Sequence, residues 1–103
     1  MHRGAIYEAD VPGVGQHPVV IVSREQAIPV LPSVVAAIVT STIRGHPAEV
    51  ALGAEQGLDH ESVANCDSIH TIPKGAFHTH RGSLGPTEMR RLDMALRIAL
   101  ALD

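Results

Sequence analysis

Polar side chains suited to holding an anion follow one apolar run of the sequence. The stretch from Ser33 to Gly45 begins with β-branched and small apolar residues, which predicts a buried strand. After this run come Thr40, Ser41 and Arg44. A rigid strand that ends in hydroxyl and guanidinium groups places donors against an anionic ligand. A core strand followed by a solvated turn is the structural alternative.

Two other segments carry side chains that can transfer protons or contact a base. His17 stands at the start of a second apolar run, and Asn65 and Asp67 lie within a later strand-like segment. In antiparallel neighbours the start of one strand lies beside the end of the next. We therefore expect His17 and Thr40 to be close together in the folded chain.

An imidazole beside hydroxyl, amide, carboxylate and guanidinium groups suits metal-free cleavage of RNA. One group removes the proton of the attacking 2′-hydroxyl, a second protonates the departing 5′-oxygen, and donors stabilise charge on the phosphate. His17 or Asp67 is the candidate for the proton transfers. The candidates for the phosphate are Thr40, Ser41 and Arg44. Each residue also has a structural explanation, as a loop histidine, a turn former or a strand end.

Other chemistries have weaker support in the sequence. Gly13-Val14-Gly15 lacks the third glycine and the following helix of a dinucleotide-binding loop, and no serine elbow is present. His78 and His80 are candidate zinc ligands, with Cys66 and His70 upstream. Structural zinc sites usually show tight paired spacings, so we interpret the first pair as solvated histidines of an edge strand. We predict no metal and no cofactor.

The composition predicts one small domain over residues 1–103. Hydrophobic residues make up 45% of the chain and aromatic residues only 2%, so the core must consist of Val, Ile, Leu and Ala. A domain of this size has little stability to spare. Burial of further apolar surface in a dimer would help.

The charge balance excludes a polycation. The formal net charge is -3 with the histidines neutral, so any nucleic-acid contact must come from a local patch. The 7 histidines would make such a patch pH-dependent, because an imidazole ordinarily titrates at about pH 6.5. The single cysteine allows no internal disulfide, which fits a reducing cytoplasm. We expect no signal peptide and no membrane span.

The pattern of apolar residues predicts several short strands followed by one helix. The expected strands are residues 5–10, 19–22, 33–40, 48–52 (returning from the third as a hairpin), 62–72 (with an interruption) and an edge strand within 78–84. The expected connections are residues 11–16, 24–32 and 53–60. A helix is predicted from Pro86, with an apolar stripe of Met89, Leu92, Leu96 and Ala99. The fold class is therefore α+β, mostly β, with a small curled sheet or barrel and a helix packed on it.

Five segments share the order and spacing of one protein family. They are residues 3–10 with their arginine-glycine opening, 17–23 with a proline-valine strand, 36–45 with a threonine motif, 62–74 and 92–100. In these segments, over nearly the whole chain, the sequence resembles the MazF/PemK (Kid) toxins of bacterial toxin–antitoxin systems.

The resemblance implies an SH3-like barrel of five to six antiparallel strands with a C-terminal helix, usually in a homodimer. It implies a cytoplasmic, metal-independent endoribonuclease that cuts single-stranded RNA at short sequences and leaves 2′,3′-cyclic phosphate and 5′-hydroxyl ends. A cognate antitoxin would inhibit the enzyme by laying a disordered segment over the RNA groove.

Residue roles follow from the resemblance by position. Thr40 takes the place of the family's active-site threonine, and Asp67 that of an aspartate proposed as general base in some members. His17 stands where the family usually has an arginine, and Asn65 where some members have a second one. Arginine stays protonated and clamps a phosphate with two parallel hydrogen bonds, whereas histidine exchanges protons near neutral pH.

Our leading hypothesis is a sequence-selective mRNA interferase toxin. Its catalytic residues would be His17, Thr40 and Asp67, and its RNA contacts Gln16, Ser41, Arg44 and Asn65. Two alternatives share the fold: a non-enzymatic toxin that poisons gyrase, and a catalytically weakened RNA-binding homologue. The sequence leaves open the cleavage site and whether the target is mRNA, rRNA or tRNA.

Overall fold

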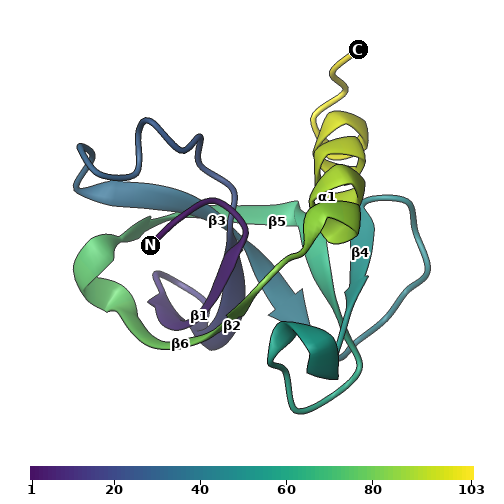
Figure 1. Ribbon diagram of the computed structural model, residues 1–103, viewed down its shortest axis with the longest axis horizontal. Helices are drawn as coiled ribbons and strands as arrows, with labels where there is room; N and C mark the ends of the chain where they lie inside the picture. The colour runs from purple at the N-terminus through teal and green to yellow at the C-terminus, as the bar shows by residue number, and fades with distance from the viewer.

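The computed structural model describes residues 1–103 and contains six strands and one α-helix (Figure 1). The elements are β1 (Ala5–Val11), β2 (Gly15–Ile21), β3 (Ser33–Thr40), β4 (Glu49–Leu52), η1 (Ala54–Gln56), β5 (Ser62–Pro73), η2 (Lys74–Ala76), β6 (Phe77–Ser83) and α1 (Pro86–Ala99). All strand pairs are antiparallel. The predicted fold class, strand number and C-terminal helix are confirmed.

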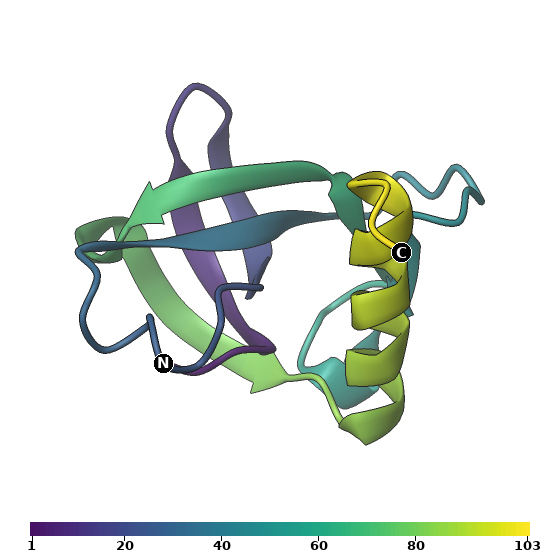
Figure 2. The same cartoon turned by 90° about the horizontal axis from the view of Figure 1, so that it is seen from above.

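The strands form one sheet in the order β4-β5-β3-β2-β1-β6. Figure 2 shows the sheet curling into a half-barrel, with α1 standing at one side. The expected hairpin between β3 and β4 is wrong, because β5 lies between them and pairs with both. Local sequence pattern marks β4 as a strand but does not specify its partner, and the connection from Ser41 to Ala48 is long enough to pass β5.

The β1–β2 connection is shorter than the loop expected over residues 11–16. Both strands continue to a tight turn, in which the Val14 N–H donates to the Val11 carbonyl at 3.0 Å. Gly13 and Gly15 adopt φ values of +76° and +114°, which glycine accommodates without steric cost. As a result His17 lies within β2, whereas the expected strand began two residues later.

The predicted interruption of β5 is confirmed as a bulge. Ala37 of β3 faces Ile69, but the next residue, Ile38, faces Asn65. The intervening residues leave the ladder and bend the strand. The Asp67 N–H donates to the Asn65 side-chain oxygen at 3.0 Å within this bulge.

The core is aliphatic, and α1 closes one side of it. The largest apolar cluster joins β-strand residues such as Ile6, Val20 and Val39 to Leu92 and Ala95 of α1. The predicted stripe is confirmed, since Leu92 is fully buried and the other stripe residues pack against the same cluster. Burial of Cys66 raises the pKa of its thiol to about 11, with a further contribution from the neighbouring Asp67 carboxylate.

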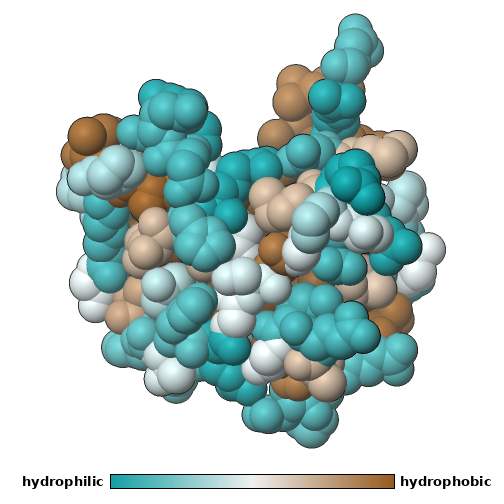
Figure 3. Space-filling view, viewed as in Figure 1, coloured by the Kyte–Doolittle hydropathy of each residue, from teal (hydrophilic) through white to brown (hydrophobic).

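The surface is mostly polar, with apolar side chains gathered over α1 and over the connection between β2 and β3 (Figure 3). The exposed apolar residues are Val30 and Leu31 in the connection, Met94 and Ile98 on α1, and Leu100 and Leu102 directly after the helix. No helix combines the length and apolar character needed to cross a membrane.

Candidate active site

The structure brings His17 and Thr40 to one small cavity. The cavity has a volume of about 250 Å³ and lies where β2 begins and β3 ends. We call it the His17–Thr40 cavity, and its lining residues are His17, Pro18, Val39, Thr40, Ser41, His60 and Ser62. Imidazole and hydroxyl groups therefore surround a space large enough for a phosphate group.

Pro18 explains why the sheet opens at this point. The Ile21 carbonyl accepts a hydrogen bond from Gly4 on the β1 side, so alternation along the strand directs the backbone of Pro18 towards β3. Proline has no N–H to donate. The β2–β3 ladder accordingly ends at the pair Val19 and Ile38, and the residues beyond it are free to line the cavity.

The hydroxyl groups of the cavity differ in what they can donate. The Thr40 Oγ1 accepts the Thr42 N–H at 3.1 Å, which leaves its own hydrogen for a ligand. The Ser62 hydroxyl instead donates to the His60 carbonyl at 3.0 Å, so its hydrogen is already engaged. Ser41 is exposed at the cavity edge.

A second hollow continues from the cavity and contains Gln16. Its volume is about 350 Å³, and it shares Pro18, His60 and Ser62 with the His17–Thr40 cavity. Its other lining residues are Glu8, Gln16, Leu58, Asp59 and Arg81. We call it the Arg81 hollow. Together the two hollows offer one continuous surface to an extended ligand.

Arg81 of β6 is held in this hollow by two carboxylates. Its Nη1 lies 2.8 Å from Glu8 of β1, and its Nη2 lies 3.1 Å from Asp59. Hydrogen bonding and charge from Asp59, with a further contribution from Glu8, raise the pKa of Arg81. The guanidinium is thus charged and already neutralised by two acidic partners.

Arg44 and Asp67 lie outside the cavity, around His46. The backbone N–H groups of Arg44 and Gly45 donate to the Glu49 carboxylate, at 3.2 and 2.8 Å. His46 Nε2 is 3.4 Å from Glu49, and its Nδ1 is 3.9 Å from Asp67. We call Arg44, His46, Glu49 and Asp67 the His46 cluster.

Electrostatics in the His46 cluster favour an ionised Glu49. Burial acts to raise the pKa of Glu49, but the donated N–H groups of Gly45 and Arg44 and the nearby His46 outweigh it and lower the pKa. Asp67 keeps 54% of its side-chain surface exposed, and Asn65 lies opposite Glu49 in the β4–β5 ladder. Neither Asn65 nor Asp67 lines the His17–Thr40 cavity.

Two residues that line these hollows, His60 and Arg81, were not predicted from the sequence. His60 falls in a polar connection without periodicity, and Arg81 in a strand read only as a sheet edge. The one available signal for His60 was its position just before a strand that neighbours the strand ending in Thr40.

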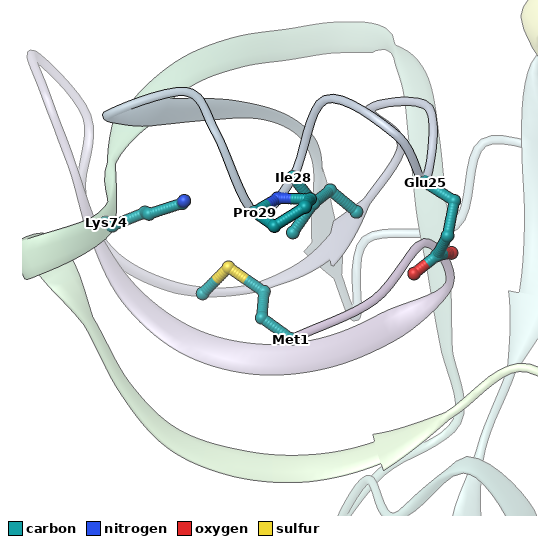
Figure 4. Close-up of a pocket in the computed structure, with 5 residues that line it drawn as sticks. All are labelled: Met1, Glu25, Ile28, Pro29 and Lys74. Atoms are coloured by element: carbon teal, nitrogen blue, oxygen red, sulfur yellow. The ribbon is translucent and has the colours of Figure 1, made fainter.

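The largest hollow of the molecule lies elsewhere. It has a volume of about 560 Å³ and is lined by Met1, Glu25, Ile28, Pro29 and Lys74. Figure 4 shows Glu25 and Lys74 at opposite sides, with apolar side chains between them. It contains none of the predicted site residues.

Fold and sequence together establish the family of this chain. Residues 2–100 match the family described as PemK-like, MazF-like toxin of type II toxin-antitoxin system. The chain belongs to this family. The resemblance to MazF/PemK toxins predicted from the sequence is confirmed.

Similar MazF proteins cover almost the same length. "Probable endoribonuclease MazF5" of Mycobacterium tuberculosis is 35% identical in an alignment of 101 positions that covers 95% of this chain and 91% of the relative. "Endoribonuclease MazF3" of the same species is 37% identical over 86 residues, 84% of each chain.

Solved MazF structures share the architecture of this chain. The Mycobacterium tuberculosis toxin MazF-mt6 superposes with a TM-score of 0.90 at 34% identity, over 96% of this chain and 98% of that one. A mycobacterial endoribonuclease in complex with its cognate antitoxin gives a TM-score of 0.90 at 34% identity, over 100% of this chain and 97% of that one.

Proposed function

We propose that this MazF-like chain is an endoribonuclease toxin that cleaves single-stranded RNA without a metal ion. We propose further that residues 1–103 form one toxin domain. The observation that carries the proposal is the presence of His17 and Thr40 in one cavity at the junction of β2 and β3. The names of the similar MazF proteins support the same activity.

The proposed reaction is a transphosphorylation. The His17 imidazole removes the proton of a 2′-hydroxyl, and the 2′-oxygen forms a bond to the adjacent phosphorus. The bond from phosphorus to the 5′-oxygen breaks, and that oxygen takes up a proton. The products are a 2′,3′-cyclic phosphate and a 5′-hydroxyl end. Thr40 and Ser41 donate to the phosphate oxygens, where charge develops.

RNA on either side of the reacting phosphate would lie across the flanking surfaces. Gln16 contacts it from the Arg81 hollow, and Arg44 from the connection between β3 and β4. Asn65 adds an amide for base contacts beside the His46 cluster. Asp67 assists from that cluster, where its carboxylate faces His46.

A cleavage assay in chelator tests this proposal. The wild-type protein should cut a long RNA in the presence of EDTA, and primer extension should map the cuts to a short recurring sequence. His17→Ala should abolish cleavage while the circular dichroism spectrum stays unchanged. Full cleavage by this variant would remove His17 from the mechanism.

The same assay separates the two alternatives. RNA bound but not cut by the wild type would indicate a weakened RNA-binding homologue. Neither binding nor cutting of RNA, together with inhibition of gyrase, would indicate a gyrase poison. The hydroxyl-lined cavity favours the nuclease, because a gyrase binder has no need for a phosphate site.

We also propose that the protein forms a homodimer, is located in the cytoplasm and is inhibited by a cognate antitoxin. Exposed apolar side chains on α1, such as Ile98 at 50% exposure, support the dimer because its formation would remove them from water. Light scattering should give twice the mass of the chain. The antitoxin is supported by the similar endoribonuclease solved with its cognate antitoxin.

A further inference from the structure

Two imidazoles from different elements line the His17–Thr40 cavity. His17 comes from β2, and His60 from the connection between β4 and β5. The rest of the lining consists of hydroxyl and apolar side chains, so no carboxylate or guanidinium lines the cavity. Imidazoles are therefore the groups at this position that exchange protons near neutral pH.

We propose that His60 is the second proton-transfer residue of this cavity, the general acid that complements His17 as general base. This inference rests on the proposed endoribonuclease function. RNA transphosphorylation needs one group that accepts the 2′-hydroxyl proton and another that donates a proton to the departing 5′-oxygen. The two imidazoles supply both, with one neutral and one protonated at the start.

The backbone around His60 is fixed on both sides. On its C-terminal side, the Ser62 hydroxyl donates to the His60 carbonyl at 3.0 Å. On its N-terminal side, Arg81 Nε donates to the Gly57 carbonyl at 3.2 Å, and Arg81 Nη2 forms an ion pair with the Asp59 carboxylate at 3.1 Å. These contacts use the carbonyl of His60 and leave its imidazole to a substrate.

Close backbone packing adds to this constraint. Gly57 has a φ of +89°, and a Cβ at this position would overlap the Arg81 carbonyl oxygen. A Cβ on Gly82 would likewise overlap the Gln56 carbonyl oxygen. Because β6 and the connection that carries His60 touch through two glycines, the histidine is presented from a rigid support.

The charges around the cavity give the protonated imidazole a second role. The charged groups that face His60 are Glu8 of β1, Asp59 of its own segment and Arg81 of β6, while Glu61 lines a separate hollow. Arg81 is already paired with both acids. As the proposed acid, His60 therefore also brings a positive charge to a phosphate in the cavity, because the Arg81 guanidinium is engaged by its two carboxylates.

The atoms balance without any other reactant. The 2′-oxygen loses its proton to His17 and bonds to phosphorus, while the bond to the 5′-oxygen breaks and His60 supplies the proton to that oxygen. After the products leave, water returns one proton to His60 and takes one from His17. The net reaction converts one phosphodiester into a 2′,3′-cyclic phosphate and a 5′-hydroxyl, with no atom gained or lost.

The test compares His60→Gln, His17→Gln and a control, His2→Gln, whose exposed imidazole lies outside the cavity. We expect kcat/KM on a short RNA from the mapped cleavage site to fall about 10²- to 10⁴-fold in each cavity variant and to be unchanged in the control. The wild type should show a bell-shaped pH profile. The alkaline limb should disappear in His60→Gln, and the acid limb in His17→Gln.

A second substrate distinguishes a general-acid role of His60 from a purely structural one. In RNA whose 5′-bridging oxygen is replaced by sulfur, the thiolate leaves without a proton. We expect His60→Gln to regain most of the wild-type rate on this substrate, and His17→Gln to remain slow.

The possible results test the endoribonuclease function and the role of His60 separately. Absence of cleavage by the wild type in chelator would overturn the proposed function itself. Wild-type cleavage with a fully active His60→Gln, or with an equal loss on both substrates, would overturn only the role of His60.

Discussion

At the residue scale, the Thr40 side chain makes one observed structural contact and has one proposed role in the reaction. Its oxygen accepts the Thr42 N–H at 3.1 Å and so shapes the turn after β3. Its hydrogen remains available to a phosphate oxygen. A hydrogen bond of the first kind typically contributes about 1 kcal/mol to folding, whereas a donor aimed at developing charge contributes more to the reaction.

Replacement of Thr40 by valine should therefore affect activity more than stability. We expect Thr40→Val to lower kcat/KM for RNA cleavage about 10²-fold. The free energy of unfolding, measured in urea, should fall by no more than about 1.5 kcal/mol. Thr40→Ser keeps the hydroxyl and should retain most of the activity. Cleavage by Thr40→Val at the wild-type rate would exclude the hydroxyl as a phosphate donor.

The sequence predicted His17 and Thr40, which line the cavity, but not His60. His17 and Thr40 were predictable because each adjoins an apolar strand, and antiparallel pairing brings such ends together. His60 was not, because its place in the cavity depends on how β6 holds an irregular connection. Gln16 lies in the adjoining hollow and Asp67 in the His46 cluster, two positions that no local pattern distinguishes.

At the element scale, the connection between β3 and β4 is organised by one carboxylate. Glu49 accepts N–H groups from Arg44 and Gly45, and these bonds together with His46 lower its pKa below the ordinary value of 4.5. A group with a depressed folded-state pKa stabilises the fold above its unfolded pKa. That stabilisation is lost as the pH falls through the folded pKa.

The Glu49→Gln variant should reveal this dependence. We expect its Tm to lie below that of the wild type at pH 7, and the difference to shrink as the pH is lowered from 4.5 towards 3, because the wild-type carboxylate becomes protonated. Thermal melts followed by circular dichroism measure the effect. Glu61→Gln, at an exposed position, should give the same Tm difference at every pH. A constant difference for Glu49→Gln would show that its charge is not involved.

The elements themselves were predictable where the apolar pattern was regular. The strand that ends at Thr40 and the stripe of α1 follow from periods of two and 3.6 residues. The pairing of β4 was not predictable, because the same β5 residues, Val63 to Asn65, pair with β3 on one edge and with β4 on the other, a long-range choice that no local pattern specifies. The start of β2 was missed because Gly13 and Gly15 were interpreted as parts of an irregular loop.

At the scale of the whole molecule, α1 closes the open side of a curled sheet. Leu92 is fully buried in a cluster that includes Ile6, Val39 and Val50 from three strands. With almost no aromatic side chains, the core depends on many small aliphatic contacts. A substitution that creates a cavity between α1 and the sheet should therefore destabilise the whole fold.

The Leu92→Ala variant should lower the free energy of unfolding by about 2–5 kcal/mol, a large part of the stability of a small domain. Urea denaturation of the variant and the wild type measures the change. Arg91→Ala, at the adjacent exposed position of α1, should change it by no more than about 0.5 kcal/mol. Equal effects of the two substitutions would mean that the helix does not anchor the core.

The position of Cys66 has a practical consequence. It is the only thiol of the chain, 1% exposed, and its pKa of about 11 keeps it protonated at neutral pH. Alkylating reagents attack the thiolate, so the native protein should resist labelling, and modification should follow the opening of the sheet. The wild-type toxin thus contains its own reporter of conformational opening, readable by mass spectrometry without any engineered probe.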